Sequence, residues 1–372
     1  MIEDSRTTNK KRLTYSSAGV DDSAADSGLN SLLKWIKKTH NIREGFGGAK
    51  LGIGHFANVV DVGRGLGVAI STDTTGSKIL IAEMIGKYDT IGIDCVAINV
   101  NDILCVGAEP VAFVDCISLE KADPGRLEQI GKGLYLGAER SKVSIVGGEI
   151  AQVKDIIKGY KPGLGLDLAG TCIGIVPIDE IITGDLIQDG DILLGVSSSG
   201  IHCNGLSLAR KALFDEGAYD ANEIFSETGR TFGEELLQPT KIYVDEVMSL
   251  LNSGIGVKGL AHITGNGGFL NLTRLNNSVG YIIDNIPTPH PVFDLIQKTG
   301  NIDDEEMFRV YNMGIGFCIV VDSASADDAM KILDAFEYTA YRMGYVVDDP
   351  SCTVKILNHN LVGTGNRYHK DT

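Results

Sequence analysis

The alternation of apolar and polar stretches predicts strands and helices in turn along most of the chain. In the first half, short apolar runs predict strands, and runs with helical spacing predict helices. The segment from Asn58 to Ile70 predicts two strands joined at a Gly63-Arg64-Gly65 turn. Further strands are predicted at residues 111–118, 143–146 and 168–176, and helices at residues 28–39, 79–85, 91–106 and 124–142.

The second half repeats this alternation after a turn-rich segment at residues 183–191. Helices are predicted from Leu206 and at residues 239–251 and 326–342, and strands at residues 192–196, 257–261, 317–321, 345–347 and 353–357. A chain of 372 residues is long enough for two cores. We therefore predict an α/β (α+β) fold with a mobile polar segment at residues 1–14, a first domain at residues 15–182 and a second at residues 183–372.

Composition and charge narrow the class of protein. Hydrophobic residues make up 43% of the chain, which is ordinary for an α/β protein, and the formal net charge is −16. That charge argues against a nucleic-acid-binding or anionic-membrane surface. No stretch is long and apolar enough to span a bilayer, and the polar start lacks the apolar core of a secretion signal, so we expect a cytoplasmic protein. The seven cysteines form no close pairs, which favours reduced core residues over a zinc site or a disulfide framework.

The segment from Ser71 to Pro110 holds the densest candidate chemistry. Four carboxylates lie in or beside its apolar runs, together with two amides and a lysine: Asp73, Asp89, Asp94, Asp102, Asn99, Asn101 and Lys78. Charged groups in such a setting are unfavourable unless they are paired or bind a cation. A metal ion with a polyphosphate is the simplest partner for this set.

The predicted local structure supports that interpretation. A strand ending at Ser71 and a helix from Ile79 place a group of residues on a strand-to-helix loop, where free amides favour an anion: Asp73, Gly76, Ser77 and Lys78. On the helix at 91–106, Asp94, Asn101 and Asp102 fall near one face. Oxygen ligands of this kind suit magnesium bridged to phosphate. The alternative is that these residues only cap helices and turns.

Other candidates follow strands or lie in glycine-rich loops. Glu149 comes after a predicted strand and two glycines, and Asp167 opens the strand at 168–176. The loops after the strands at 192–196 and 257–261 contribute Ser199, Gly200, His202, Asn204, His262, Thr264 and Gly265, and Asn312 lies in a later loop. A glycine loop comprises Gly45, Phe46, Gly47 and Gly48. For each of these, a turn, a helix cap or a structural histidine is the competing interpretation.

Taken together, the motifs resemble those of the phosphoribosylformylglycinamidine cyclo-ligases, or aminoimidazole ribonucleotide synthetases, of the PurM family. In chain order, from about Tyr15 to the final strands, they are YSSAGVD, STDTTGSK, YDTIGIDCVAINVNDILCVGAEP, IVGGE, DLAGTCIGIV, GVSSSGIHCNGLSL, AHITGNGG and YNMGIGF. The resemblance implies a two-domain PurM-like fold, with a mixed-sheet N-terminal domain that dimerises and a C-terminal α/β domain. It also implies a ligase of purine biosynthesis that uses ATP and Mg²⁺ to convert formylglycinamidine ribonucleotide to 5-aminoimidazole ribonucleotide, ADP and phosphate.

The resemblance also implies roles for individual residues. The nucleotide would meet Asp73, Gly76, Ser77, Lys78 and Asn101, with the loop Gly45, Phe46, Gly47 and Gly48 closing over it. The metal ligands would be Asp73, Asp94, Asp102, Glu149 and Asp167. The substrate would meet Ser199, Gly200, His202, Asn204, Thr264, Gly265 and Asn312. Lys78 would neutralise the moving phosphoryl group, and His262 or an aspartate such as Asp102 would handle the proton.

Two departures from the family pattern leave other functions open. The family usually has Asp-Gly-Val-Gly-Thr-Lys where this chain has Asp73-Thr-Thr-Gly-Ser-Lys78, so Thr74 replaces a glycine of the phosphate loop and Thr75 a valine. In addition, Gln152 replaces an acidic residue. Both changes concern ATP and metal binding. The competing functions are another ATP-using enzyme of the same superfamily, such as one like thiamine monophosphate kinase, and a non-catalytic nucleotide-binding protein.

Overall fold

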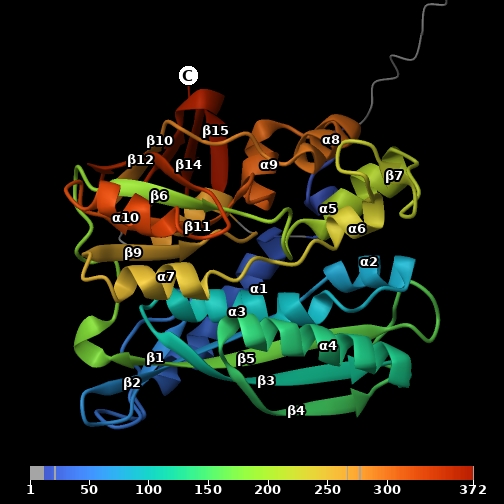
Figure 1. The fold of residues 1–372 in the computed structure, drawn as a ribbon, viewed down its shortest axis with the longest axis horizontal. Helices are drawn as coiled ribbons and strands as arrows, with labels where there is room; N and C mark the ends of the chain where they lie inside the picture. Colours follow the sequence, from blue (N-terminus) through green and yellow to red (C-terminus); the bar gives the residue numbers. More distant parts are fainter. Residues whose placement is uncertain (1–11, 21, 266, 276–277, 372) are drawn as a thin grey trace, which may run out of the picture.

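The structure is a computed structural model that describes residues 12–20, 22–265, 267–275 and 278–371. Its strands form two large sheets, one from each half of the chain, with helices between and around them (Figure 1). The predicted two-domain α/β arrangement is thereby confirmed. In the described part of the chain, no helix combines the length and the apolar composition that crossing a membrane requires.

The first sheet has five strands in the order β1-β2-β5-β3-β4. Only β3 and β4 run parallel, while the other neighbours are antiparallel. Along β5 buried and half-buried residues alternate strictly, so one face of the sheet lies on the core and the other is more open. The strands are β1 (Asn58–Asp61), β2 (Leu66–Thr74), β3 (Glu109–Leu119), β4 (Ser144–Gln152) and β5 (Leu166–Pro177).

Helices α3 (Ile91–Leu104) and α4 (Pro124–Ser141) lie on the core face of this sheet (Figure 1). The first turn of α4 is capped by the Asp123 carboxylate, which accepts a hydrogen bond from the Arg126 amide. Helix α3 is buried along almost its whole length. It packs on β2, β3 and β5 on one side and on α7 (Val244–Leu251) and β9 (Val257–His262) of the second domain on the other. Polar side chains on α3 therefore lie between the two domains.

The second sheet has eight strands in the order β15-β14-β13-β10-β12-β6-β11-β9. Its remaining strands are β6 (Ile192–Ser197), β10 (Val279–Ile283), β11 (Ile315–Val321), β12 (Ala340–Asp348), β13 (Val354–Ile356), β14 (Leu361–Thr364) and β15 (Arg367–Lys370). Around it lie α5 (Leu206–Arg210), continued by the π-helical η4 (Lys211–Glu216), and α6 (Phe232–Leu236), α8 (Pro291–Gly300), α9 (Asp304–Val310) and α10 (Ala326–Leu333). The other elements are η1 (Ser16–Ala18), α1 (Asp22–Ile36), η2 (Lys37–Thr39), α2 (Lys78–Ile85), η3 (Ile178–Glu180), β7 (Ile224–Phe225), β8 (Arg230–Thr231), η5 (Gly268–Arg274) and η6 (Leu357–His359).

Most predicted elements are present, and several bounds were wrong. Strand β2 continues past Ser71 to Thr74, and α1 begins at Asp22 rather than Gly28. Strand β4 continues through Gly147 to Gln152 because it stays paired with β3 along that length. Helix α7 begins at Val244 rather than Pro239, since the amides of Thr240 and Tyr243 donate to side chains of α3 instead of to a helix. Helix α10 ends at Leu333, and residues 340–348 form β12 because they pair with β6 and β10.

The domain limits themselves remain predictions. The expected boundary between residues 182 and 183 falls between the last strand of the first sheet and the first strand of the second. Of the segment 1–14, residues 1–11 lie outside the described residues. Leu13 is buried, and its amide donates to the Gly300 carbonyl oxygen (3.1 Å), so the end of that segment is held on the second domain.

Candidate active site

An ion pair between α2 and α3 of the first domain is hydrogen-bonded to the second domain. Lys78 Nζ lies 2.8 Å from Asp94 Oδ1, and both side chains have 0% exposure. Lys78 also donates to the Gln238 carbonyl oxygen (2.6 Å), and Asp94 Oδ1 accepts from the amide and hydroxyl of Thr240 (2.7 Å each). The predicted roles of Lys78 at the nucleotide and of Asp94 at a metal are thereby corrected, because these charges neutralise each other in a closed junction.

Asn101 has a similar structural position. Its Nδ2 donates to the Lys241 carbonyl oxygen (2.8 Å), and its Oδ1 accepts from the Tyr243 amide (3.1 Å). The side chain is fully buried, so the predicted contact with a nucleotide is also corrected. Asn101 instead satisfies main-chain groups of the non-helical segment before α7.

Asp102, one residue further along α3, faces a more open region. His262 Nδ1, at the end of β9, lies 2.9 Å from Asp102 Oδ1, and the Ser71 hydroxyl lies 3.4 Å from Oδ2. Because an ionised carboxylate only accepts, Nδ1 is the donor, and Nε2 then accepts from Asn101 Nδ2 at 3.5 Å. The Asp102 side chain is 18% exposed, whereas that of His262 is 1% exposed. Asp102 is therefore the member of the pair that a ligand can reach.

Asp73 and Asp115 lie on the same face of the first sheet as α3. In the sheet register Asp73 is opposite Gly170, and Gly170 is opposite Asp115, so the two acids sit about 10 Å apart across one strand. Burial raises the pKa of Asp73, the Thr74 amide lowers it, and the charge of Asp102 raises it again. Burial also raises the pKa of Asp115. Asp73 thus belongs to β2 rather than to the predicted loop.

Asp115 was not among the residues predicted from the sequence, although its strand position carries a signal. Within the predicted strand at 111–118, alternation puts Asp115 on the same side as Phe113 and Ile117, both of which are buried. A carboxylate on the apolar side of a strand is unfavourable without a partner. That pattern could have identified it.

Glu149 and Asp167 lie on the opposite face of the sheet. Glu149 is in register with Cys116, the neighbour of Asp115, and Asp167 is in register with Ser118 and accepts from the Thr74 hydroxyl (2.8 Å). Successive strand residues point to opposite faces, so neither joins Asp73. Within the described residues, no three His, Cys, Asp or Glu side chains form a group able to hold a metal. The five acids expected to bind the metal, Asp73, Asp94, Asp102, Glu149 and Asp167, therefore do not form one group in this structure.

His202 and Asn312 form hydrogen bonds with the main chain of the predicted substrate loop after β6. His202 Nε2 accepts from the Ser199 amide (3.2 Å), and Asn312 Nδ2 donates to the Gly200 carbonyl oxygen (2.9 Å). Both side chains are buried. Burial, and then the charge of His262, holds the pKa of His202 well below its usual value, consistent with a neutral ring that accepts a hydrogen bond. The expectation that His202 and Asn312 contact substrate is corrected to a positioning role.

The remaining predicted contacts lie on two loops and a hairpin. Asn204 packs against Gly265, where an added Cβ would lie 2.8 Å from Asn204 Oδ1, and the Thr264 carbonyl oxygen accepts from Asn271 (3.0 Å). Gly76 has φ +58°, and the Ser77 hydroxyl meets that of Ser207 at 3.1 Å. The predicted glycine loop lies against the β1–β2 hairpin, where the Gly47 amide donates to the Asp61 carbonyl oxygen (2.6 Å). Exposed Phe46 lies near Gly63. Within the loop, the Gly48 amide donates a hydrogen bond to the Gly45 carbonyl oxygen. Whether these residues contact a ligand remains a prediction.

Comparison with known proteins decides the family. The model of the AIR synthase related protein N-terminal domain matches residues 54–176, and that of the corresponding C-terminal domain matches residues 188–356. The phosphoribosylformylglycinamidine cyclo-ligase of Methanocaldococcus jannaschii is 47% identical over 94% of this chain and 96% of its own length. This chain belongs to the phosphoribosylformylglycinamidine cyclo-ligase family. The cyclo-ligase of Methanobrevibacter smithii is 46% identical over 94% of this chain and 99% of its own length. The cyclo-ligase of Pyrococcus furiosus is 44% identical over 92% of this chain and 98% of its own length.

Solved structures place the cyclo-ligase fold in a wider group. A HypE–HypF complex matches with a TM-score of 0.60 at 20% identity, covering 84% of this chain and 93% of the other. A thiamine-monophosphate kinase from Stenotrophomonas maltophilia matches with a TM-score of 0.59 at 19% identity, covering 83% and 91%. At these identities the match concerns the fold alone. The sequence relatives, which are cyclo-ligases, confirm the resemblance of the motifs. They support this function over that of a thiamine monophosphate kinase.

His55 is a further residue beside the cyclo-ligase site that the sequence did not reveal. Both ring nitrogens are buried and have no hydrogen-bond partner among the described residues. The ring packs edge-on against Phe56, with centroids 5.7 Å apart. Burial, then Arg274, lowers the pKa of His55 to about 4, while Asp102 and Asp185 oppose this. A single histidine in a glycine-rich segment carried no signal.

Acid is expected to destabilise the protein through His55. The folded state keeps this ring neutral down to about pH 4, whereas the unfolded chain takes up its proton near 6.5. Its contribution is therefore complete above pH 6.5 and is lost as the pH falls toward 4. His55→Gln should reduce the slope of unfolding free energy against pH in this window by about 1 kcal/mol per pH unit, measured by urea unfolding. Exposed His369→Gln is the control, and equal slopes in all three proteins would contradict the assignment.

Proposed function

We propose that this chain closes the imidazole ring of formylglycinamidine ribonucleotide, using ATP and releasing 5-aminoimidazole ribonucleotide, ADP and phosphate. The single observation that carries the proposal is 47% identity, over almost the full length of both chains, to a phosphoribosylformylglycinamidine cyclo-ligase. The reachable Asp102 carboxylate, held by His262 at the domain junction, is the local chemistry that fits it.

The formyl oxygen is a poor leaving group, so the reaction begins by transferring the γ-phosphoryl group of ATP to it. The amidine nitrogen then attacks the formyl carbon, the carbon–oxygen bond breaks, and phosphate leaves. The attacking nitrogen must lose a proton. Asp102 accepts it in our proposal, because it is exposed while His262 is not. His262 fixes the carboxylate through Nδ1, and so acts as a positioning residue.

Magnesium fits the carboxylates on the α3 side of the sheet. Mg²⁺ is commonly held by one or two carboxylates together with substrate phosphates and water, so a cluster of three acids is unnecessary. Asp73 and Asp115 provide such oxygens on one face of the sheet. When bound, the ion would neutralise charge on the phosphates. Ser199, Gly200 and Asn204 remain the proposed contacts of the substrate phosphate and ribose.

The proposal is tested by mixing pure protein with formylglycinamidine ribonucleotide, ATP and Mg²⁺. We expect equal amounts of ADP and aminoimidazole product, and no product when EDTA removes the metal. Production of neither compound would overturn the enzyme assignment and leave a nucleotide-binding protein. ADP formation on thiamine monophosphate without the ribonucleotide would favour the kinase alternative.

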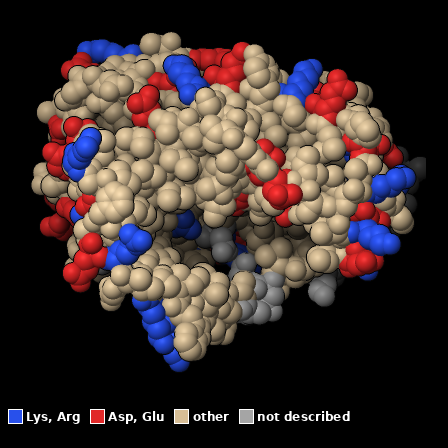
Figure 2. Space-filling view, turned by 90° about the horizontal axis from the view of Figure 1, so that it is seen from below, with Lys and Arg blue, Asp and Glu red and all other residues tan. Residues whose placement is uncertain are grey.

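We also propose that the chain forms a homodimer through the open face of the first sheet. Strand β4 is an edge strand whose residues are nearly all exposed. Exposed apolar side chains lie on three strands of this sheet: Ile70 on β2, Val111 on β3 and Val146 on β4. Seen from the side on which this sheet lies, the surface has a broad area without charged residues (Figure 2). A long, flat, apolar edge of this kind tends to pair with another chain.

Val146→Glu is expected to convert the dimer to monomers, because it places a charge on this face. Val146 is 67% exposed in the single chain, and Leu186, which is 76% exposed in the turn-rich segment between the sheets, offers a matched control. Light scattering coupled to size exclusion should give a dimer for the unaltered protein and for Leu186→Glu. A monomeric unaltered protein, or a dimeric Val146→Glu variant, would contradict the interface.

A further inference from the structure

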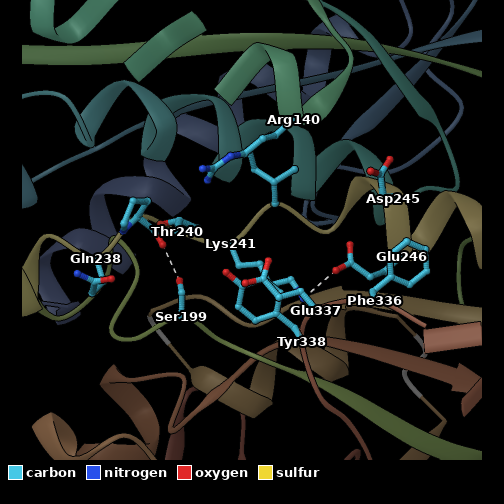
Figure 3. A pocket seen from close by; sticks show the side chains of 12 residues that line it. Arg140, Ser199, Gln238, Thr240, Lys241, Asp245, Glu246, Phe336, Glu337 and Tyr338 are labelled. Carbon is cyan, nitrogen blue, oxygen red and sulfur yellow. Dashed lines mark hydrogen bonds and ion pairs between the residues drawn. The ribbon is translucent and has the colours of Figure 1, made fainter. Parts of the chain in front are cut away.

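A cavity lies at the domain junction and is lined in part by residues 238–242, the segment that contacts Lys78 and Asp94. It measures about 540 Å³, which is within the range of small-molecule sites. Figure 3 shows side chains from both domains around it. The lining includes charged, hydroxyl and aromatic side chains: Arg140, Ser199, Lys241, Phe336, Glu337 and Tyr338.

Three of the charged groups that line this cavity, Lys241, Glu246 and Asp245, are already in ion pairs. Lys241 Nζ lies 2.8 Å from Glu246 Oε1 and 3.5 Å from the centre of the Tyr338 ring, and it is buried. Asp245 Oδ1 lies 2.5 Å from Lys142 Nζ. These contacts build a rigid wall, because the lysine is held by a carboxylate and an aromatic face together.

Two opposite charges on exposed side chains of the lining lie outside these ion pairs, although the charge of Glu337 acts to raise the pKa of Lys241. Arg140, at the end of α4 in the first domain, and Glu337, after α10 in the second, have no ion pair among the residues that the structure describes. Figure 3 shows them entering the cavity from different elements. With the pairs Lys241–Glu246 and Lys142–Asp245 taken into account, the lining is balanced apart from one guanidinium and one carboxylate.

Tyr338 lies close to both of these charges. Burial, and then Glu337, raises the pKa of Tyr338, whereas Arg140 lowers it. The Arg140 guanidinium and the Glu337 carboxylate therefore both lie close enough to the Tyr338 hydroxyl to affect its pKa. Phe336 and the Tyr338 ring supply apolar surface next to them.

We propose that this cavity binds a small zwitterion, of the α-amino acid class, with its carboxylate on Arg140 and its ammonium group on Glu337. A guanidinium pairs with a carboxylate through two parallel hydrogen bonds, and a carboxylate accepts strongly from an ammonium group. A dianionic phosphate ester fits less well, because the second negative charge meets Glu337 and no further unpaired cation. The side chain of the amino acid rests on Phe336 and Tyr338.

The occupant would contact the segment that closes the domain junction. Thr240, which lines the cavity, donates to Asp94, and the Gln238 carbonyl accepts from Lys78. The Ser199 hydroxyl, also at the cavity, donates to the Pro239 carbonyl oxygen (2.5 Å). Binding is therefore expected to raise the melting temperature of the whole protein.

The test is calorimetric titration of the full chain with L-phenylalanine, L-glutamine, 3-phenylpropionate and 2-phenylethylamine. The last two carry only one of the two charges. At least one amino acid should bind, with both single-charge analogues at least about tenfold weaker. Arg140→Gln and Glu337→Gln should each weaken amino-acid binding by about tenfold or more without changing the kcat of ring closure, and Lys331→Gln, on the exposed face of α10, should change neither.

Three results would overturn the proposal. They are no binding of either amino acid at about 10 mM, equal binding of 3-phenylpropionate, which would indicate a plain anion site, and unchanged amino-acid binding in Arg140→Gln or Glu337→Gln. Because neither residue belongs to the proposed reaction, failure of this test leaves the ring-closing function untouched. A protein without ring-closing activity that still binds the amino acid in this manner would support the cavity alone.

Discussion

Asp102→Asn is expected to lower kcat by about 10²–10⁴-fold, because the amide can neither accept the proton of the attacking nitrogen nor carry its charge. The substitution keeps the shape of a side chain that is only partly buried, so the fold should remain intact. His262→Asn should lower kcat less, since His262 acts through Asp102 and does not reach the ligand. Steady-state rates, with circular dichroism as the check on folding, measure both effects.

The control for this pair is Asp328→Asn, which changes an exposed carboxylate on α10 and should leave kcat unaffected. Retained activity in Asp102→Asn would remove it from the reaction. A larger loss in His262→Asn than in Asp102→Asn would reverse the two roles and make the histidine the proton acceptor.

Lys78→Met is expected to lower the free energy of unfolding by about 3–5 kcal/mol, because it leaves Asp94 charged, buried and without its cation. It also removes the donor to the Gln238 carbonyl oxygen, a hydrogen bond that joins the two domains. Urea unfolding measures the change. Any loss of activity in Lys78→Met should be proportional to the fraction of protein that is unfolded.

The matched control is Lys298→Met, which breaks an exposed pair with Asp294 within α8 and should change stability by at most about 1 kcal/mol. A fully stable Lys78→Met protein that fails only to bind ATP would contradict the structural role and restore the nucleotide contact expected from the motif.

The comparison of α3 with its sequence shows what pattern alone could determine. Helical spacing correctly predicted the helix and the polar residues Asp94, Asn101 and Asp102 on it. Spacing could not distinguish a carboxylate that meets a metal from one that meets a buried lysine, because both satisfy the same charge. The partner is Lys78, 16 residues away, together with main-chain groups about 140 residues further on.

For the acids of the first sheet, the sequence did not show which side chains share a face. Glu149 and Asp167 were grouped with Asp73 because each lies near a strand end, while Asp115 was overlooked inside a strand. Registers of neighbouring strands decide which side chains share a face, and a shift of one residue reverses the face. No local pattern contains that information.

The order of strands and helices, two sheets from two halves of the chain, and the family itself followed from the sequence, because periodicity and motif order are local properties of the chain. The contacts between the domains did not follow from it. Only packing of α3 between the first sheet and α7 and β9 turned Lys78 and Asp94 into a closed pair, left Asp102 reachable, and opened a cavity between Arg140 and Glu337. Such outcomes depend on which groups exclude one another from water, and that is set by residues far apart in the chain.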